Sequence, residues 1–431
     1  MSINNPLTRI RDTYAEYPRP FWTLIFGTFI DRVGGALVYP FLTLYITRRF
    51  GVGMTQVGAI FGLFSIASLV GSTLGGALTD RLGRKGMLIF GLIASAMTSL
   101  LMGLVNSIGL FYGTALVAGF FSHVAAPAQQ ATVADLLPEE QRAQGYGLLR
   151  VVVNLAVTIG PAIGGLLAAR SYLFLFICDA VSSLITAAIV ALALPETKPA
   201  PAEGEPEQTV AQTFAGYWTV LRDTTFILFI GASILMILVY MQASGTLAVY
   251  LRDVHAVSEQ RFGTIISLNA GMVVLFQFSV TRWIKRYRPL AMMAAGSLLY
   301  AIGFAMYGFV STYAMFLVAM VIITVGEMLN APTGQALVAR FAPEDMRGRY
   351  MAVYSLAWML PSTFGLLLAG LIMDNFDPRW VWYAAGIVGL VAAGAFALLE
   401  RRAGQATEPA TQATGPATPA CHAEPQPQSP R

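Results

Sequence analysis

The chain has 431 residues, of which 56% are hydrophobic and 12% are charged, and its mean hydropathy is +0.63. Soluble domains usually carry about 25% charged residues, so this composition excludes a water-soluble protein. The formal net charge of +4 does not indicate nucleic-acid binding, because the basic residues gather in short segments between apolar runs. Two cysteines, Cys178 and Cys421, give neither a disulfide framework nor metal-ligand spacing.

Twelve apolar segments follow one another along the chain. A helix that crosses about 30 Å of hydrocarbon needs about 20 residues at 1.5 Å per residue. The segments long enough to do so are 20–46, 55–79, 86–106, 109–136, 145–169, 172–194, 225–250, 261–281, 289–309, 313–340, 348–373 and 378–399. The first segment is too long for a cleaved signal peptide and predicts an uncleaved membrane anchor.

Polar segments divide the chain into five parts. These are an N-terminal cytoplasmic segment (1–19), a first six-helix half (20–195), a cytoplasmic linker (196–224), a second six-helix half (225–400) and a disordered cytoplasmic tail (401–431). The linker is rich in Pro, Ala and Glu and is predicted to be mobile, with a short amphipathic helix at Phe214–Arg222 on the membrane surface. The tail is mostly Pro, Ala, Thr and Gln and cannot bury a core.

The distribution of Lys and Arg predicts the orientation. With the N-terminus inside, 20 of the 27 Lys and Arg residues fall in cytoplasmic segments, 6 fall in outer loops, and Arg32 lies within the first span. Cytoplasmic loops carry the excess of positive charge in membrane proteins. We therefore expect a multi-pass protein of a bacterial-type inner membrane, with both termini in the cytoplasm.

The two halves are related in sequence. Residues 125–142 and 330–347 are identical at nine of eighteen positions at an offset of 205. Two six-helix halves in parallel repeat, with a substrate site between them at midplane, are a plan that transporters use. The predicted fold is therefore all-α and integral to the membrane, with twelve transmembrane helices in two parallel-repeat halves around a central cavity.

The loop after the second predicted helix contains a motif. Residues 76–85 read GALTDRLGRK, which resembles the G-x-x-x-D-R-x-G-R-R/K signature of the major facilitator superfamily. The resemblance implies a latch that joins the halves on the cytoplasmic side, with Asp80 bridging to the start of the eleventh helix. A positively charged loop anchor is the alternative. The latch residues that the resemblance implies, including an acidic partner for the arginines, are Gly76, Asp80, Arg81, Gly83, Arg84 and Asp135.

The fifth predicted helix carries Gly160, Pro161, Gly164 and Gly165. This pattern is similar to the G-x-x-x-G-P-x-x-G-G signature of drug:proton antiporters in the same superfamily, although Ala156 replaces its first glycine. Small residues let helices approach closely, and a proline leaves one backbone carbonyl without its helical donor. The superfamily's usual fourth-helix arginine is absent, because His123 is the one basic candidate between residues 111 and 130.

Three of the charged residues within predicted spans are candidates for proton coupling. Asp31 is about 16 Å into the first helix and Glu327 lies near the middle of the tenth, at 1.5 Å per residue. Ionisable residues at this depth are costly, and burial favours the protonated form of a carboxyl. We therefore expect Asp31 and Glu327 to carry protons in a central cavity, with Arg32 contributing to coupling. Neighbouring helix positions point about 100° apart, so Arg32 is expected to face away from Asp31 and to pair with Asp179 or Glu327, or to accept an anionic group.

The remaining polar residues within spans outline a cavity. Asp179 is expected to be structural and His123 to be a packing residue. Met241 adds a polarizable surface suited to lipophilic ligands. The predicted cavity residues are Tyr39, Asn154, Tyr240, Gln242, Asn269 and Met328.

The function that fits these features is proton-coupled efflux of small lipophilic molecules or drugs by alternating access. An ATP-binding phosphate loop is excluded, because no Gly-Lys dipeptide occurs in the chain. A nutrient or peptide uptake symporter is an alternative, and a membrane enzyme or receptor is a third class. No cluster of catalytic, cofactor-binding or metal-ligating residues is found, so we predict that the chain is not an enzyme. Its expected partners are a small-molecule substrate, protons and the lipid bilayer, and it is expected to be a monomer.

Overall fold

A computed structural model of the chain describes residues 16–198, 218–343 and 346–407, and all regular secondary structure within these ranges is helical. A few side chains inside these ranges are not described, namely those of Ala77, Asp80, Arg81, Ala143, Ala339, Arg347, Gly348 and residues 403–407. Among the described residues, twelve helical spans are long and apolar enough to cross a membrane, and they confirm the predicted twelve-helix fold.

The first half is built from helices that match the first six predicted spans. They are α2 (Arg19–Val38), η1 (Tyr39–Phe41), α3 (Leu42–Phe50), α4 (Met54–Leu82), α5 (Arg84–Leu104), α6 (Ile108–Val124), α7 (Ala126–Leu136), α8 (Glu139–Ala168) and α9 (Tyr172–Ala193). The first span is one continuous helical stretch with a 3₁₀ turn at its middle, where Pro40 supplies no backbone N–H.

The second half repeats this order. Its helices are α11 (Thr224–Tyr240), η2 (Met241–Ala243), α12 (Thr246–His255), α13 (Glu259–Ile284), α14 (Pro289–Phe309), α15 (Tyr313–Phe341), α16 (Arg347–Asn375) and α17 (Trp380–Thr407). One difference lies within the sequence repeat itself. The first half breaks at Ala125 between α6 and α7, whereas α15 continues through Pro332.

The parts of the chain outside the two halves are described only in part. Residues 218–222 are helical, whereas the rest of the predicted amphipathic helix, residues 214–217, lies outside the described residues. The same holds for residues 1–15, 199–213 and 408–431, so the predicted mobile linker and disordered tail remain predictions. Helix α17 continues to Thr407, which places the end of the last helix beyond the predicted boundary at residue 400.

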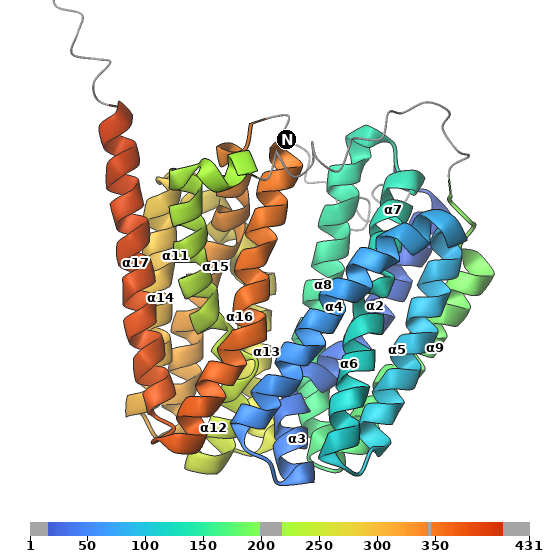
Figure 1. Cartoon of the computed structure of the whole chain (residues 1–431), viewed down its shortest axis with the longest axis horizontal. Helices are drawn as coiled ribbons and strands as arrows, with labels where there is room; N and C mark the ends of the chain where they lie inside the picture. Colours follow the sequence, from blue (N-terminus) through green and yellow to red (C-terminus); the bar gives the residue numbers. More distant parts are fainter. Residues whose placement is uncertain (1–15, 199–217, 344–345, 408–431) are drawn as a thin grey trace, which may run out of the picture.

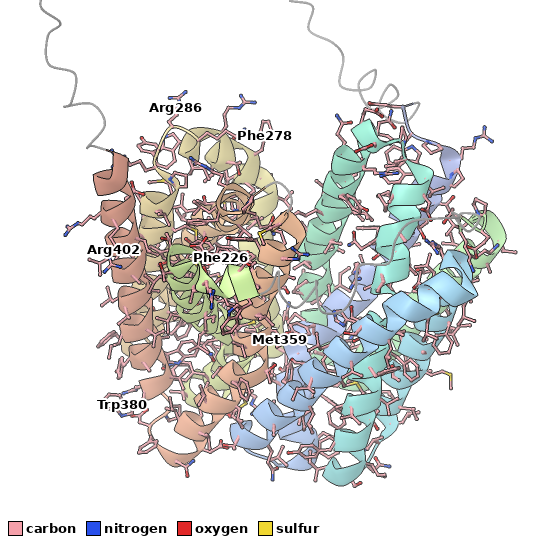
Figure 2. The ribbon with its side chains drawn as sticks, turned by 45° about the horizontal axis from the view of Figure 1, so that its top comes forward. Phe226, Phe278, Arg286, Met359, Trp380 and Arg402 are labelled. Atoms are coloured by element: carbon pink, nitrogen blue, oxygen red, sulfur yellow. The ribbon has the colours of Figure 1, made fainter. Side chains whose placement is uncertain are left out.

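Successive spans run in opposite directions, so an even number of them returns the chain to its starting end. We call this end, where α4 meets α5 and where α17 finishes, the linker end, and the opposite end, which holds α3 and α12, the far end. Figure 1 shows the halves converging at the far end and diverging toward the linker end. In Figure 2, Arg286 and Arg402 lie toward the linker end and Trp380 lies at the far end.

Glycines let the two halves contact each other near the far end, where α4 packs against α16 and α8 packs against α13. A Cβ at Gly58 would overlap the backbone of Leu367, and one at Gly370 would overlap the backbone of Met54. Without these side chains the helix backbones approach closely, as small residues permit in membrane helices. The pairs α4–α16 and α8–α13 are equivalent under the sequence repeat, so the halves meet symmetrically.

Three sets of polar contacts also join the two halves at the far end. The Asp374 carboxylate of α16 accepts from the backbone amides of Met54 (2.8 Å) and Thr55 (2.7 Å) at the start of α4. Arg48 of α3 pairs with Glu259 of α13 at 3.0 Å. The Arg252 guanidinium of α12 donates to α3 at the Thr47 hydroxyl (2.9 Å) and the Leu44 carbonyl (3.4 Å). We call the Asp374 contact the far-end clasp.

Candidate functional site

A cavity of about 480 Å³ lies within the first half. Its wall on the first span is formed by Thr28, Asp31, Arg32 and Gly35 of α2 and by Tyr39 of η1, and residues of α4, α5, α6, α7, α8 and α9 complete it. Leu24, Ala36 and Val38 of α2 also line the cavity, so the lining positions cover a broad sector of this helix. The first predicted proton-carrying residue, Asp31, therefore faces a space large enough for a small molecule.

The carboxylates of this cavity are held by serine hydroxyls. Ser183 of α9 donates to Asp31 Oδ1 at 2.9 Å, and Ser99 of α5 donates to Asp179 Oδ2 at 2.7 Å. Asp179 was expected to be structural, but it lines the same cavity as Asp31. It lies seven residues after the start of α9, about 10 Å along the helix at 1.5 Å per residue, so it is well inside the span.

Arg32 differs from its predicted placement. We expected it to face away from Asp31, but both residues line the cavity. The 100° between neighbouring positions does not separate them, because the cavity wraps around a broad sector of α2. The expected ion pair with Asp179 or Glu327 is also wrong: within the described residues, no carboxylate oxygen lies within 4.0 Å of Arg32. Its exposed guanidinium stands beside two carboxylates without touching either.

A second cavity, of about 270 Å³, lies between the halves. Tyr39, Phe64 and His123 line both cavities, which places the two side by side. The second half contributes Met241 and Met359, and Figure 2 shows Met359 on the side of its half that faces the first half. His123, expected to pack inside the protein, is exposed in these cavities and bonds the Ser122 hydroxyl through Nδ1 at 2.9 Å.

Glu327 lies in the second half, held from two helices. Tyr240 of α11 donates its hydroxyl to Glu327 Oε1 at 3.0 Å, and Asn269 of α13 donates its amide to Oε2 at 2.8 Å. The same Asn269 amide donates to Thr324 at 3.0 Å, one turn before Glu327 on α15. The carboxyl group therefore accepts from neutral donors. Within the described residues no Lys or Arg lies within ion-pair distance of it.

Aromatic rings adjoin the Glu327 site. The Tyr240 ring stacks on Tyr300 with centroids 5.6 Å apart and meets the edge of Trp358 at 6.3 Å. Tyr240 also precedes Met241, which lines the cavity between the halves. A carboxyl group beside aromatic faces suits a positively charged or polarizable ligand.

The other predicted cavity residues take different places. Gln242 is buried and donates to the Leu238 carbonyl (3.0 Å) and the Gly365 carbonyl (3.4 Å), so it joins α11 to α16. Met328 is buried, with its carbonyl accepting from Gln277. Asn154 is exposed on α8 and lines neither of the two cavities. The structure therefore brings together Tyr240 and Asn269 with Glu327, and Tyr39 with the two cavities.

The glycine-proline motif on α8 forms a packing surface. Gly160 lies against Ala36 of α2, and Gly165 lies against α13, where its Cβ would come within 3.0 Å of the Glu259 carbonyl. A Cβ on Gly263 of α13 would in turn lie 2.6 Å from the Pro161 carbonyl. The motif thus joins α8 both to its own half and to the other half. Proline cannot donate to the carbonyl four residues earlier, which belongs to the cavity residue Val157.

The signature loop is tied to its own half in this structure. Arg84 Nε pairs with Asp135 Oδ2 at 3.1 Å, and the Thr197 hydroxyl donates to the same oxygen at 3.3 Å. Gly83 has φ of 89°, a region that favours glycine. The structure does not describe the side chains of Asp80 and Arg81, so their predicted latch contacts remain predictions.

Glu196, the first linker residue, caps α5. Its carboxylate accepts from the backbone amides of Arg84 (2.8 Å), Lys85 (3.2 Å), Thr197 (3.0 Å) and Lys198 (3.0 Å). Burial acts to raise the pKa of this carboxyl, but the four amides outweigh that effect and hold the pKa below its usual value. A helix N-terminus stabilises a negative charge.

We expect Glu196→Gln to destabilise the protein slightly. A lowered pKa stabilises the folded state above the unfolded-state pKa, and this stabilisation is lost as the pH falls through the folded-state value. At pH 7 the loss should be below about 1 kcal/mol, because the carboxylate is exposed. In detergent, the thermal unfolding temperature of Glu196→Gln should lie below that of the wild type at pH 7, and the difference between them should be smaller near pH 4. The exposed Glu140→Gln is the control, and a difference that is unchanged at low pH would refute the capping explanation.

Sequence reasoning missed Asp374, Glu196 and the cavity role of Asp179. Asp374 and Glu196 lie at span ends, where acidic residues usually face water. Only the tertiary structure brings them to the amides of α4 and α5. The signal that was available was a bare helix start in each case, since Gly53 and Gly83 offer no side chain to cap α4 and α5.

Two six-helix halves that enclose cavities, with a carboxyl inside a membrane span of each half, are typical of a membrane transporter. The sequence profile of the Major Facilitator Superfamily matches residues 24–289 and 243–426, and the chain belongs to this superfamily. It is therefore a secondary transporter and not an enzyme.

Similar proteins include a bacterial antiporter and a bacterial multidrug resistance protein. A Na(+), Li(+), K(+)/H(+) antiporter of Planococcus maritimus is 27% identical over 411 residues, which cover 89% of this chain and 94% of that protein. The multidrug resistance protein MdtH of Shigella dysenteriae is 23% identical over 372 residues, covering 85% and 90%. The crystal structure of a POT family transporter in complex with 5-aminolevulinic acid superimposes with a TM-score of 0.76 at 17% identity, covering 89% and 96%, and shares the fold.

Proposed function

We propose that this chain exports small lipophilic molecules, with lipophilic cations as favoured substrates, in exchange for protons. The observation that carries the proposal is the presence of half-buried carboxyls within membrane spans of both halves, Asp31 in the first-half cavity and Glu327 beside Tyr240. Two relatives support it by name, one an antiporter that exchanges cations for protons and one a multidrug resistance protein.

Exchange of substrate for protons follows if the two compete for the same carboxyls. A carboxyl inside the membrane is stable when a proton or another positive charge neutralises it. A lipophilic cation near Glu327 can supply that charge, with the faces of Tyr240, Tyr300 and Trp358 adding cation–π attraction. Proton and substrate then exclude each other, which is the requirement for antiport.

The two halves are in contact at the far end and diverge toward the linker end (Figure 1). This supports a state of the transporter that is open toward the linker end. If the linker end is cytoplasmic, as the Lys and Arg distribution predicts, this state takes substrate from the cytoplasm and releases protons there. Reversing the closure would release substrate outside and admit protons. For a neutral substrate, one proton moving through about 100 mV supplies about 2.3 kcal/mol, enough for about a fiftyfold gradient. Exchange of one proton for one singly charged cation moves no net charge, so it is driven by the pH gradient, at about 1.4 kcal/mol and tenfold per pH unit.

Inverted membrane vesicles test the substrate class. With an acidic interior generated by respiration, an exported substrate should release protons and raise the fluorescence of a pH-sensitive dye. Ethidium should give this response, whereas sodium or potassium chloride should not. A response to the alkali salts alone would assign cation exchange in place of drug efflux. Substrate movement in the same direction as protons would indicate the alternative uptake symporter.

The signature loop is proposed to latch the halves together when the far end opens. Asp80→Asn should leave the protein folded and inserted but reduce transport at least tenfold, because the latched state loses its charge–helix contact. Transport assays at matched expression check this, with Glu139→Gln at the start of α8 as the control. Normal transport by Asp80→Asn would leave only the loop-anchor interpretation.

A further inference from the structure

Two carboxyls of the first-half cavity lie close together on facing helices. A Cβ at Gly34 would lie 2.9 Å from Asp179 Oδ1, and Gly34 is three residues after Asp31 on α2. Ser183, which donates to Asp31, is four residues after Asp179 on α9. Residues three or four apart on a helix are neighbours about 5–6 Å apart, so both relations place the carboxyls within about one helical turn of each other.

The charged groups around the two carboxyls have no net charge when one proton is bound. The titratable or charged side chains that line the cavity are Asp31, Arg32, Tyr39, His123 and Asp179. With both carboxyls ionised and Arg32 charged, the cluster has a net charge of −1, and binding one proton makes it neutral. Two carboxylates this close in a membrane resist simultaneous ionisation, and such pairs titrate as a unit.

In each carboxyl, one oxygen accepts a serine hydrogen bond and the other is available to bind that proton. Ser183 occupies Asp31 Oδ1 and Ser99 occupies Asp179 Oδ2, so Asp31 Oδ2 and Asp179 Oδ1 are outside these two hydrogen bonds. Arg32 stabilises whichever carboxyl remains ionised, without contacting either. The arrangement favours neither carboxyl as the exclusive proton carrier.

We propose that Asp31 and Asp179 share one exchangeable proton, so that Asp179 is a second proton-carrying residue of the transporter. The proposal rests on the proposed proton-coupled function and adds a residue to it. When the proton leaves to water in the cavity, the cluster becomes negative and attracts a cationic substrate. Arg32 limits that negative charge to one unit, which matches a singly charged cation.

If the two carboxyls share one proton, each substitution should shift the pH midpoint of proton binding in the first half in a defined direction. Asp31→Asn and Asp179→Asn each remove the repulsion and leave one carboxylate beside Arg32, so both should move the midpoint to lower pH by about one unit or more. Arg32→Gln removes the attraction and should move it to higher pH. The double variant Asp31→Asn/Asp179→Asn should lose the titration. Asn keeps an acceptor for each serine hydroxyl, which limits structural damage.

Infrared difference spectra of the purified protein measure the protonated carboxyl band against pH, independently of transport. The spectrum of the double variant supplies the baseline, and the exposed Asp377→Asn is the control that should shift nothing. Acid shifts in both single variants and an alkaline shift in Arg32→Gln support sharing. If Asp179→Asn does not fold, Ser99→Ala replaces it: losing the hydroxyl donor destabilises the ionised carboxyl, so the midpoint should rise.

An unshifted midpoint in both Asp179→Asn and Ser99→Ala would overturn the proposal and return Asp179 to a structural role. Loss of the titration in Asp31→Asn alone would overturn it as well, since Asp31 would then be the sole carrier. The pH dependence of ethidium transport in the same variants separates the two claims. Infrared shifts without any pH-driven transport by the wild-type protein would support sharing and refute the proposed function.

Discussion

Glu327→Gln should abolish pH-driven efflux while leaving downhill exchange of substrate. Glu327 is held by Tyr240 and Asn269, and Gln has nearly the same shape and resembles the protonated carboxyl. The variant should therefore fold, because burial already favours the neutral form. The variant has no proton to release beside Tyr240, where substrate and proton are proposed to compete, so the pH gradient no longer drives substrate release from that site, whatever proton Asp31 and Asp179 carry. We expect accumulation against a gradient to fall at least tenfold, to the level of vesicles that lack the protein.

The controls for Glu327→Gln separate charge from packing. Glu400→Gln removes a carboxylate at the linker end, where Glu400 pairs with the exposed Arg288, and should leave accumulation within about twofold of wild type. Tyr240→Phe removes one hydrogen bond to Glu327 but leaves the carboxyl, so it should shift the pH dependence without abolishing coupling. Wild-type accumulation by Glu327→Gln would show that the proton is carried elsewhere.

Asp374→Asn should shift the protein toward the state with an open far end. Each Asp374 oxygen accepts from one amide of α4, and an Asn side chain offers one acceptor and turns an N–H toward the other amide. The carboxylate is exposed, so its helix-terminus contact contributes about 0.3–1 kcal/mol. With the lost hydrogen bond, the equilibrium between the two states should shift about five- to tenfold.

Spin-label distances between α3 and α12 measure this shift in a background without Cys178 and Cys421. Gly53→Ala gives a second test, because a Cβ at that position would overlap the Asp374 carboxylate and displace it. Asp377→Asn is the matched control, since the Asp377 carboxylate accepts from the backbone amide of Arg379 in its own loop. Equal distance distributions in Asp374→Asn and Asp377→Asn would show that the glycine contacts alone close the far end.

The spans and the repeat could be predicted because they depend on local properties. About 20 apolar residues are needed to cross the hydrocarbon, and charged loops mark where each crossing ends. The glycines of α8 could also be found, since close helix contact requires small residues wherever the partner lies. These features need no knowledge of which helices are neighbours.

The orientation of each helix could not be predicted, and this led to the error at Arg32 and left the cavity position of Asp179 unforeseen. A membrane helix is apolar toward both lipid and protein, so its hydrophobic pattern does not mark the buried side. Asp179 occupies a span that is apolar all round, and only its contacts with Ser99 and α2 place it in a cavity. The far-end clasp joins residues 320 positions apart, and no local pattern links Asp374 to a bare helix start in the other half.

Transport in reconstituted liposomes tests proton-coupled antiport most directly. The interior is made acidic, the membrane potential is clamped at zero with potassium and valinomycin, and ethidium is added outside. Its permanent charge excludes the pH trapping that affects weak bases. Wild-type protein should accumulate ethidium inside above the external concentration, protons should leave in parallel, and nigericin should abolish the gradient. Equilibration to equal concentrations, with the same rate in wild type and Glu327→Gln, would contradict proton-coupled export.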